Sequence, residues 1–158
     1  MKKIIAILFL IFTCSSQAIE KQIATNWCWA SSVQDVLFQA GIFQSQNYIA
    51  QKLTGWPQNR PAHINEVVWL VNSYGLKAWA VSQPASADEL YGTLSSGWKI
   101  IAFVRPLDGP VGHFIVLEGI SPNGNIYVGD PTTGMTFEET LLNLYNGWNW
   151  GGSVVVGK

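Results

Sequence analysis

Cys28 stands at the start of an apolar helical pattern and could act as a nucleophile. Apolar residues recur at helical spacing behind it, and Gly41 predicts the end of the helix. The first turn of a helix presents unpaired N–H groups and a partial positive charge, which stabilise a thiolate, the reactive form of cysteine. The alternative is a thiol that serves only packing, with Trp27 and Trp29 as core aromatics around it.

A thiol nucleophile needs a base, and the chain has two histidines. His113 follows Gly112 and begins an apolar run that predicts a strand, so its ring could face a cleft at the rim of a sheet. His63 lies in a polar loop before a helix, where a capping or solvent-exposed role is expected. Because a catalytic base must be orientable by a third group, we take His113 as the candidate base. The alternative for His113 is a structural histidine at a strand start.

Asp130 is the candidate for the third group. It ends the strand that follows the strand of His113, and a hairpin would bring both ends to one edge of the sheet. A turn centred on residues 121–122 places Asp130 opposite His113, whereas a two-residue turn at 123–124 places it opposite Leu117. Both registers put Asp130 and His113 on the same face of the sheet. The alternative is that the Asp-Pro pair is only a turn.

Acyl transfer also needs hydrogen-bond donors for the developing oxyanion. The backbone N–H of Cys28 at the helix start is one natural donor, and the side-chain amide of Gln22, six residues upstream, could be the second. Taken by itself, Gln22 would be a solvated surface residue.

The surrounding pattern predicts the elements that position these residues. Helices are expected over residues 28–40, 46–53 and 64–74, with a short strand at 77–81 and a helix from the capping-box pattern at 86–89 to about residue 95. Strands are expected at 99–105, 113–120, 125–128 and 153–156, and a second capping-box pattern at 136–139 predicts a helix to about residue 145. Because helices come mostly first and strands mostly last, the fold class is α+β.

Composition limits the classes of function. The chain has 158 residues, of which 48% are hydrophobic and 12% charged, so one packed domain is expected. The net charge is −1 and basic residues form no run, which argues against a nucleic-acid partner. One nucleophilic cysteine and two distant histidines form no metal-ligand cluster, so neither a metal nor another cofactor is expected.

The first residues predict a targeting segment. Lys2 and Lys3 precede an apolar stretch at 4–12, and a small-x-small cleavage pattern ends at Ala18. We expect residues 1–18 to be a signal peptide and 19–158 the mature domain, secreted or periplasmic, since the apolar stretch is too short for a permanent span. Cleavage leaves Cys28 as the lone cysteine, without an internal disulfide. Lipid attachment at Cys14 is the alternative.

Together these residues resemble the papain-like cysteine peptidase clan. Gln22, the segment 26–31 around Cys28, Gly112-His113-Phe114 and the segment 128–131 around Asp130 occur in the clan's order, and the chain looks like the compact bacterial members such as effector-type cysteine peptidases. The resemblance implies a two-lobed fold, a helical lobe with the cysteine and a sheet lobe with the histidine and aspartate. It implies Gln22 in the oxyanion hole, Cys28 as nucleophile, His113 as base and then acid, and Asp130 orienting the imidazole.

The sequence departs from the larger members of the clan in two ways. About nine residues separate the expected cleavage site from Cys28, which is too few for an inhibitory propeptide. Control would then come from export, a separate inhibitor protein or narrow substrate preference. Asn149-Trp150-Gly151 resembles the clan's Asn-x-Trp-Gly signature without its intervening residue, so Asn149 is the rival to Asp130 for orienting His113.

The expected function is hydrolysis of peptide or amide bonds through a Cys28 acyl-enzyme, in a monomer acting on a protein or peptide. A peptidoglycan amidase or a transglutaminase-like acyl transferase would use the same residues. A binding module that has lost catalysis is the third alternative, which the intact set of Gln22, Cys28 and His113 disfavours.

Overall fold

A six-stranded antiparallel sheet organises the protein. The computed structural model describes residues 18–105 and 112–157, so the predicted signal peptide lies almost wholly outside the described residues. The strands are β1 (Lys77–Val81), β2 (Lys99–Val104), β3 (His113–Ile120), β4 (Ile126–Asp130), β5 (Met135–Glu139) and β6 (Trp150–Gly157). Their order across the sheet is β1-β6-β2-β3-β4-β5, and every neighbouring pair is antiparallel.

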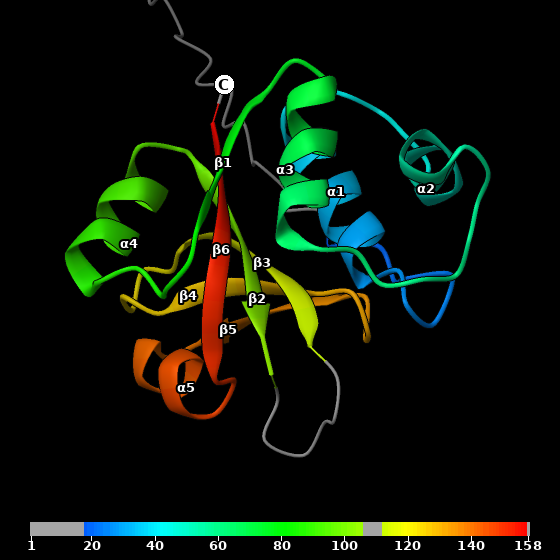
Figure 1. The fold of residues 1–158 in the computed structure, drawn as a ribbon. Helices are drawn as coiled ribbons and strands as arrows, with labels where there is room; N and C mark the ends of the chain where they lie inside the picture. The colour runs from blue at the N-terminus through cyan, green and yellow to red at the C-terminus, as the bar shows by residue number, and fades with distance from the viewer. Residues whose placement is uncertain (1–17, 106–111, 158) are drawn as a thin grey trace, which may run out of the picture.

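Helices cover both faces of this sheet. They are α1 (Cys28–Gln39), α2 (Gln46–Thr54), α3 (Ile64–Ser73), α4 (Ala87–Ser95) and α5 (Leu141–Asn146). The first three lie together on one side of the sheet, and α4 and α5 lie on the other (Figure 1). The mixture of an N-terminal helical half with a mostly antiparallel C-terminal half confirms the predicted α+β class.

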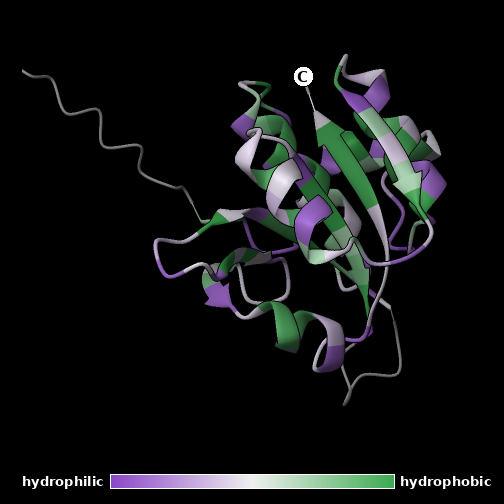
Figure 2. Ribbon diagram, turned by 90° about the vertical axis from the view of Figure 1, so that its left-hand side faces the viewer, coloured by the Kyte–Doolittle hydropathy of each residue, from purple (hydrophilic) through white to green (hydrophobic). Residues whose placement is uncertain are grey.

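Each face of the sheet has its own hydrophobic core. One cluster joins α1, α2 and α3 to alternate residues of β2, β3 and β6, with Trp29, Leu37 and Ile101 fully buried. The other joins α4 and α5 to the opposite side chains, such as Ile115 and Leu117. The strands are accordingly hydrophobic over much of their length, whereas the helices carry hydrophilic segments (Figure 2). Burying one large aliphatic side chain stabilises the fold by about 1.5–3 kcal/mol, so these clusters hold the helices on the sheet.

The predicted elements before residue 100 are all present, but the second capping-box pattern misleads. Residues 135–139 form strand β5, which pairs with β4 along its whole length. The side chain of Phe137 packs against the second core. The helix that follows begins later, because the hydroxyl of Thr140 accepts the N–H of Asn143 at 3.2 Å and caps α5. Pairing with β4 therefore overrides the local helix-start signal at 136–139.

The β3–β4 hairpin contains an irregularity that matters for the site. Ile120 pairs with Ile126, so the connecting turn spans residues 121–125. The register then shifts by one residue between Leu117 and Gly119, which makes Glu118 the extra residue of a β-bulge. A one-residue shift moves every later side chain of the pairing to the other face.

Both registers predicted for Asp130 are wrong, although the shared face is right. Gly129 pairs with Val116, so the next residue, Asp130, falls opposite Ile115. His113 is two residues further along β3, and Asp130 therefore lies diagonally across from it. Without the bulge, Asp130 would fall opposite Val116 and point to the face away from His113. The bulge at Glu118 is therefore what brings the two side chains to one face.

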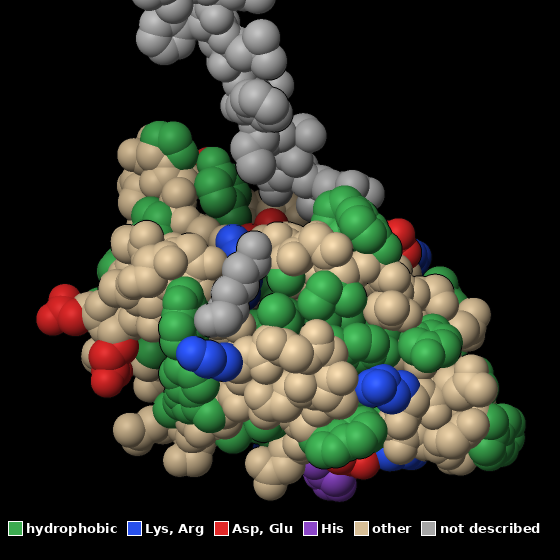
Figure 3. Space-filling view, turned by 90° about the horizontal axis from the view of Figure 1, so that it is seen from above, with side chains coloured by type: hydrophobic (Ala, Val, Ile, Leu, Met, Phe, Trp, Pro, Cys, Tyr) green, Lys and Arg blue, Asp and Glu red, His purple; other side chains and the backbone are tan. Residues whose placement is uncertain are grey.

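No helix in the described part of the chain is long and apolar enough to span a membrane. On the face seen from above, the Lys and Arg side chains of the described residues are few and scattered, without a basic patch (Figure 3).

Candidate active site

Cys28 is the first residue of helix α1. Its side chain is a free, buried thiol with 9% exposure, and Trp27 occupies the N-cap position before it. The first turn of α1 carries no acidic side chain that would oppose a negative charge on sulfur. The thiol therefore faces the positive end of the helix dipole, as the sequence predicts.

A loop after α2 holds the segment around Cys28. The indole N–H of Trp27 donates to the carbonyl of Gln58 at 2.7 Å, and that of Trp29 donates to the carbonyl of Arg60 at 2.9 Å. Both indoles are buried in the first core. Each buried indole N–H is thus satisfied, and the two bonds anchor the start of α1 to residues 58–60.

His113 and Asp130 form the central contact of the site. The ring Nε2 of His113 lies 2.7 Å from Oδ1 of Asp130, and their side chains are only 14% and 9% exposed. Because Asp130 engages Nε2, the other ring nitrogen, Nδ1, is left for the thiol. This is the arrangement in which a carboxylate fixes the orientation of an imidazole beside a nucleophile.

The turn after β4 holds the carboxylate of Asp130 in place. The backbone N–H of Thr132 donates to Oδ1 at 2.9 Å, and the hydroxyl of Thr133 lies 3.3 Å from Oδ2. The hydroxyl of Thr132 also approaches Nε2 of His113, at 3.3 Å. Thr132 is a site residue that the sequence did not single out, because a threonine after an Asp-Pro pair looks like ordinary turn chemistry.

The electrostatics favour a protonated His113. Burial by itself lowers the pKa of His113, but hydrogen bonds with Asp130 and Cys28, together with the charges of both, raise it to about 9. Burial likewise tends to raise the pKa of Asp130, yet the bonds from His113 and the N–H of Thr132 hold it below its usual range. The site thus favours an imidazolium that is held by the Asp130 carboxylate and lies beside the sulfur of Cys28.

Gln22 lies in the segment before α1, and its side-chain amide bonds to backbone carbonyls of the same segment. Its Nε2 donates to the carbonyls of Ala24 at 3.1 Å and Thr25 at 2.8 Å, while its Oε1 is buried without a hydrogen-bond partner among the described residues. Its backbone N–H donates to the carbonyl of Pro131 at 2.8 Å, which ties it to the turn after Asp130. Gln22 is therefore beside the site, with its donors engaged elsewhere.

Gln46 positions this segment and gave no signal in the sequence. Its side chain is 2% exposed and lies at the start of α2. Its Nε2 donates to the carbonyl of Lys21 and to Oε1 of Gln34, and its Oε1 accepts the N–H of Ile23, all at 3.0 Å. A single glutamine thus fixes the backbone on both sides of Gln22.

The two rival residues lie in other settings. His63 is the N-cap residue of α3, where its backbone N–H donates to the carboxylate of Glu66 at 2.8 Å, in line with the expected capping position. Asn149 precedes β6 with a φ of 46°, and its carbonyl accepts the N–H of Arg105 at 3.3 Å. Among the described residues, the His113 ring has hydrogen bonds with Asp130 and Thr132.

Metal ligation has no support in the described residues, since no group of three or more His, Cys, Asp or Glu among residues 18–105 and 112–157 could hold an ion.

Comparison with known proteins identifies the family of this chain. The model of the Peptidase_C39 like family matches residues 12–150. No curated protein matches the chain.

Several solved structures share the fold at low identity. The peptidase domain of Streptococcus ComA, a bi-functional ABC transporter involved in a quorum sensing pathway, is 16% identical with a TM-score of 0.69, over 89% of this chain and 98% of that one. A double glycine motif protease from an AMS/PCAT transporter, in complex with the leader peptide, is 17% identical with a TM-score of 0.65, over 90% and 94%. The N-terminal peptidase C39 like domain of the toxin secretion ATP-binding protein from Vibrio parahaemolyticus is 16% identical with a TM-score of 0.56, over 84% and 97%.

Proposed function

This chain belongs to the Peptidase_C39 like family of cysteine peptidases in the papain-like clan, and from that membership we propose that it is an exported enzyme that cleaves peptide substrates through a Cys28 acyl-enzyme. The family confirms the resemblance in the sequence and the class of enzyme. The export, the residues that act and the substrate are the proposal.

One observation supports the roles of the residues above all others. Nε2 of His113 lies 2.7 Å from Oδ1 of Asp130, and Cys28 stands at the helix terminus beside the same ring and contributes to its raised pKa. Such a triad makes Cys28 the nucleophile, His113 the proton carrier and Asp130 the residue that orients the ring.

The proposed reaction balances in two steps. The Cys28 thiolate attacks the carbonyl carbon of the scissile bond, and the His113 imidazolium donates its proton to the leaving amine as the C–N bond breaks. A water then attacks the thioester, with neutral His113 accepting its proton, and releases the carboxylic acid and the thiolate. The backbone N–H of Cys28 and a rotated amide of Gln22 would stabilise each oxyanion, which requires Gln22 to release Ala24 or Thr25.

Peptides are the proposed substrates because a solved structure that shares this fold is a double glycine motif protease bound to a leader peptide. Export rests on the pattern of residues 1–18. We therefore suggest testing extended peptides with and without a Gly-Gly pair.

Mass spectrometry of the purified chain with these peptides tests the proposal. We expect cleavage, and an acyl adduct on Cys28 that is absent in Cys28→Ala. If dye-labelled fragments were released from purified sacculi while the test peptides remained uncleaved, the result would favour the amidase. Transfer of the acyl group to an added amine in preference to water would favour the acyl transferase, and no adduct with any substrate would exclude the proposed chemistry.

A further inference from the structure

Two buried carboxyl groups, one on α1 and one at the β3 bulge, lie near enough for the charge of one to act on the other. Asp35 of α1 is 6% exposed and Glu118, the bulge residue itself, is 7% exposed. Burial, followed by the negative charge of Glu118, raises the pKa of Asp35 to about 7, and burial also raises that of Glu118. Their hydrogen bonds are few: Gln39 donates to Oδ2 of Asp35 at 2.6 Å, and Thr136 donates to Oε1 of Glu118 at 3.0 Å.

One lysine faces this pair of acids, and its single positive charge can balance only one negative charge. Lys99 of β2 lowers the pKa of both carboxyls by its charge, and its Nζ donates to the backbone carbonyl of Glu118. Glu20 lines the cavity beside Asp35 but is exposed and bonded to Gln34. In the described part of the chain, Oδ1 of Asp35 has no hydrogen-bond donor. Two buried acids thus share one ammonium.

The backbone nitrogen of Ile19 is linked to Glu118 through the hydroxyl of Thr136. The Ile19 side chain is 2% exposed, and its N lies 3.5 Å from the hydroxyl of Thr136, which in turn bonds Glu118. The side chains of Glu118 and Ile19 both lie against Gly129. If Gly129 carried a Cβ atom, that atom would stand 2.3 Å from Oε1 of Glu118 and 3.2 Å from Cβ of Ile19.

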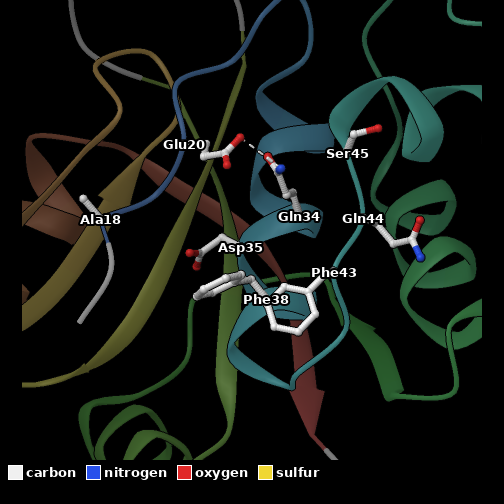
Figure 4. Close-up of a pocket in the computed structure, with 8 residues that line it drawn as sticks. All are labelled: Ala18, Glu20, Gln34, Asp35, Phe38, Phe43, Gln44 and Ser45. Atoms are coloured by element: carbon white, nitrogen blue, oxygen red, sulfur yellow. Dashed lines mark hydrogen bonds between the residues drawn. The ribbon is translucent and has the colours of Figure 1, made fainter. Parts of the chain in front are cut away.

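Asp35 of α1 faces the residue before Ile19 across a cavity. Ala18, directly before Ile19, and Asp35 line one cavity of about 420 Å³. In Figure 4 the Asp35 carboxyl points to the side of the cavity on which Ala18 lies. The bond between Ala18 and Ile19 therefore sits between the cavity with Asp35 and the polar contacts of Glu118.

This bond is also the cleavage point that the first eighteen residues predict. We propose that hydrolysis between Ala18 and Ile19 creates an α-ammonium that forms an ion pair with Glu118 and Asp35, and that this ion pair fixes the bulge on which the His113–Asp130 contact depends. Water adds across the amide, leaving a carboxylate on Ala18 and an ammonium on Ile19. The inference rests on the proposed export and concerns the regulation of the proposed site.

The chemistry of the two states differs in charge and in donors. The intact peptide offers one neutral N–H, whereas the ammonium offers a positive charge and three donors to the two acids. Since the side chain of Ile19 is buried in the folded domain, a processing peptidase must cut before the domain has folded. The mature chain would then fold around its own N-terminus, with two cations facing two carboxylates.

A comparison of two chain lengths tests the ion pair. One chain begins at Ile19 and the other retains Ser15–Ala18, which carries its ammonium away from the cavity; both carry Cys28→Ala. At pH 7 we expect the Ile19 chain to melt about 5 °C higher, a shift typical of one favourable interaction in a domain of this size. The double variant Asp35→Asn with Glu118→Gln should abolish the difference, while Glu20→Gln should preserve it. Equal melting temperatures, or a difference that survives the double variant, would overturn the proposal.

The pH dependence gives a second signature. The folded-state pKa of Asp35 is raised, so the longer chain should lose stability as pH rises from about 4 through about 7. The Ile19 chain should resist this loss until its α-ammonium deprotonates, above about pH 8 for an ordinary amino terminus. Parallel curves for the two chains would contradict the ion pair.

The link to the active site needs the intact thiol. In chains that keep Cys28, alkylation below neutral pH should be several-fold faster for the chain that begins at Ile19, and identical rates would overturn the link to the bulge. Because melting does not depend on catalysis, a stability difference without peptidase activity in either chain would contradict the proposed function and support the ion pair.

Discussion

Asp130 meets His113 on one face of the sheet because strand β3 contains one extra residue, Glu118. The hairpin turn alone would send the Asp130 side chain to the opposite face. A local irregularity in one strand thereby determines a 2.7 Å contact between two strands. The contact raises the pKa of the imidazole and lowers that of the carboxyl, and the predictions below depend on it.

The first prediction concerns the reactivity of Cys28. Iodoacetamide should alkylate Cys28 rapidly at pH 5–6, because the raised pKa of His113, about 9, keeps the imidazolium beside the sulfur throughout this range. In His113→Ala the reaction should be slow there and should rise only toward the pH of an ordinary thiol, about 8.5. His63→Ala is the matched control and should behave as wild type. Equal profiles for the wild type and His113→Ala would contradict a working pair.

The second prediction concerns the carboxylate. Asp130→Asn keeps the shape but removes the charge that raises the pKa of His113, so the alkaline limit of kcat/KM should move down from about pH 9. The loss in kcat/KM at pH 7 should be about 10²-fold or more, as expected for a group that orients a catalytic imidazole. Asn149→Ala is the control and should leave the alkaline limit in place. An unchanged limit in Asp130→Asn together with a shifted one in Asn149→Ala would reverse their roles.

Stability should follow the same ion pair, with a definite sign. The pKa of His113 is raised, so its contribution is full below about pH 6.5 and is lost as pH rises through about 9. The pKa of Asp130 is lowered, so its contribution is present above about pH 4 and is lost in acid. Urea unfolding of wild type and Asp130→Asn should therefore differ most between about pH 4 and 6.5. A difference that is constant from pH 4 to 10 would indicate that charge is not involved.

The fourth prediction concerns Gln22. If its amide rotates to bind the oxyanion, Gln22→Ala should lower kcat by about 10²–10³-fold with little change in KM. Gln51→Ala, at an exposed position of α2, is the matched control. An increase in KM alone would assign Gln22 to substrate binding or to the shape of its loop.

The anchor of the nucleophile segment can be tested by stability alone. Trp29→Phe removes the donor to the Arg60 carbonyl and leaves space in the first core, so it should destabilise the fold by about 2–4 kcal/mol. Trp56→Phe, at a side chain that is 65% exposed, should change the free energy of unfolding by less than about 0.5 kcal/mol. Denaturant titration of both variants measures this, and similar effects for the two would show that the indole bond contributes little.

The sequence by itself determined most of the local elements and supplied the candidate catalytic residues. The helical period behind Cys28 places it in the first turn of α1, and the β-branched run after His113 forms β3 with the predicted bounds. These features depend on neighbours along the chain, which the sequence displays directly. The order of motifs was enough to identify the clan that the family match confirms.

Tertiary structure decided how those residues meet. Strand pairing placed residues 136–139, which carry a helix-start pattern, in β5, and a bulge at Glu118 set a register that no turn pattern predicted. The buried Gln46, which holds the loop of Gln22, and the pair of Asp35 with Glu118 join residues far apart in sequence. A lone glutamine or acid carries no local signal, because its role arises only from the groups that folding packs against it.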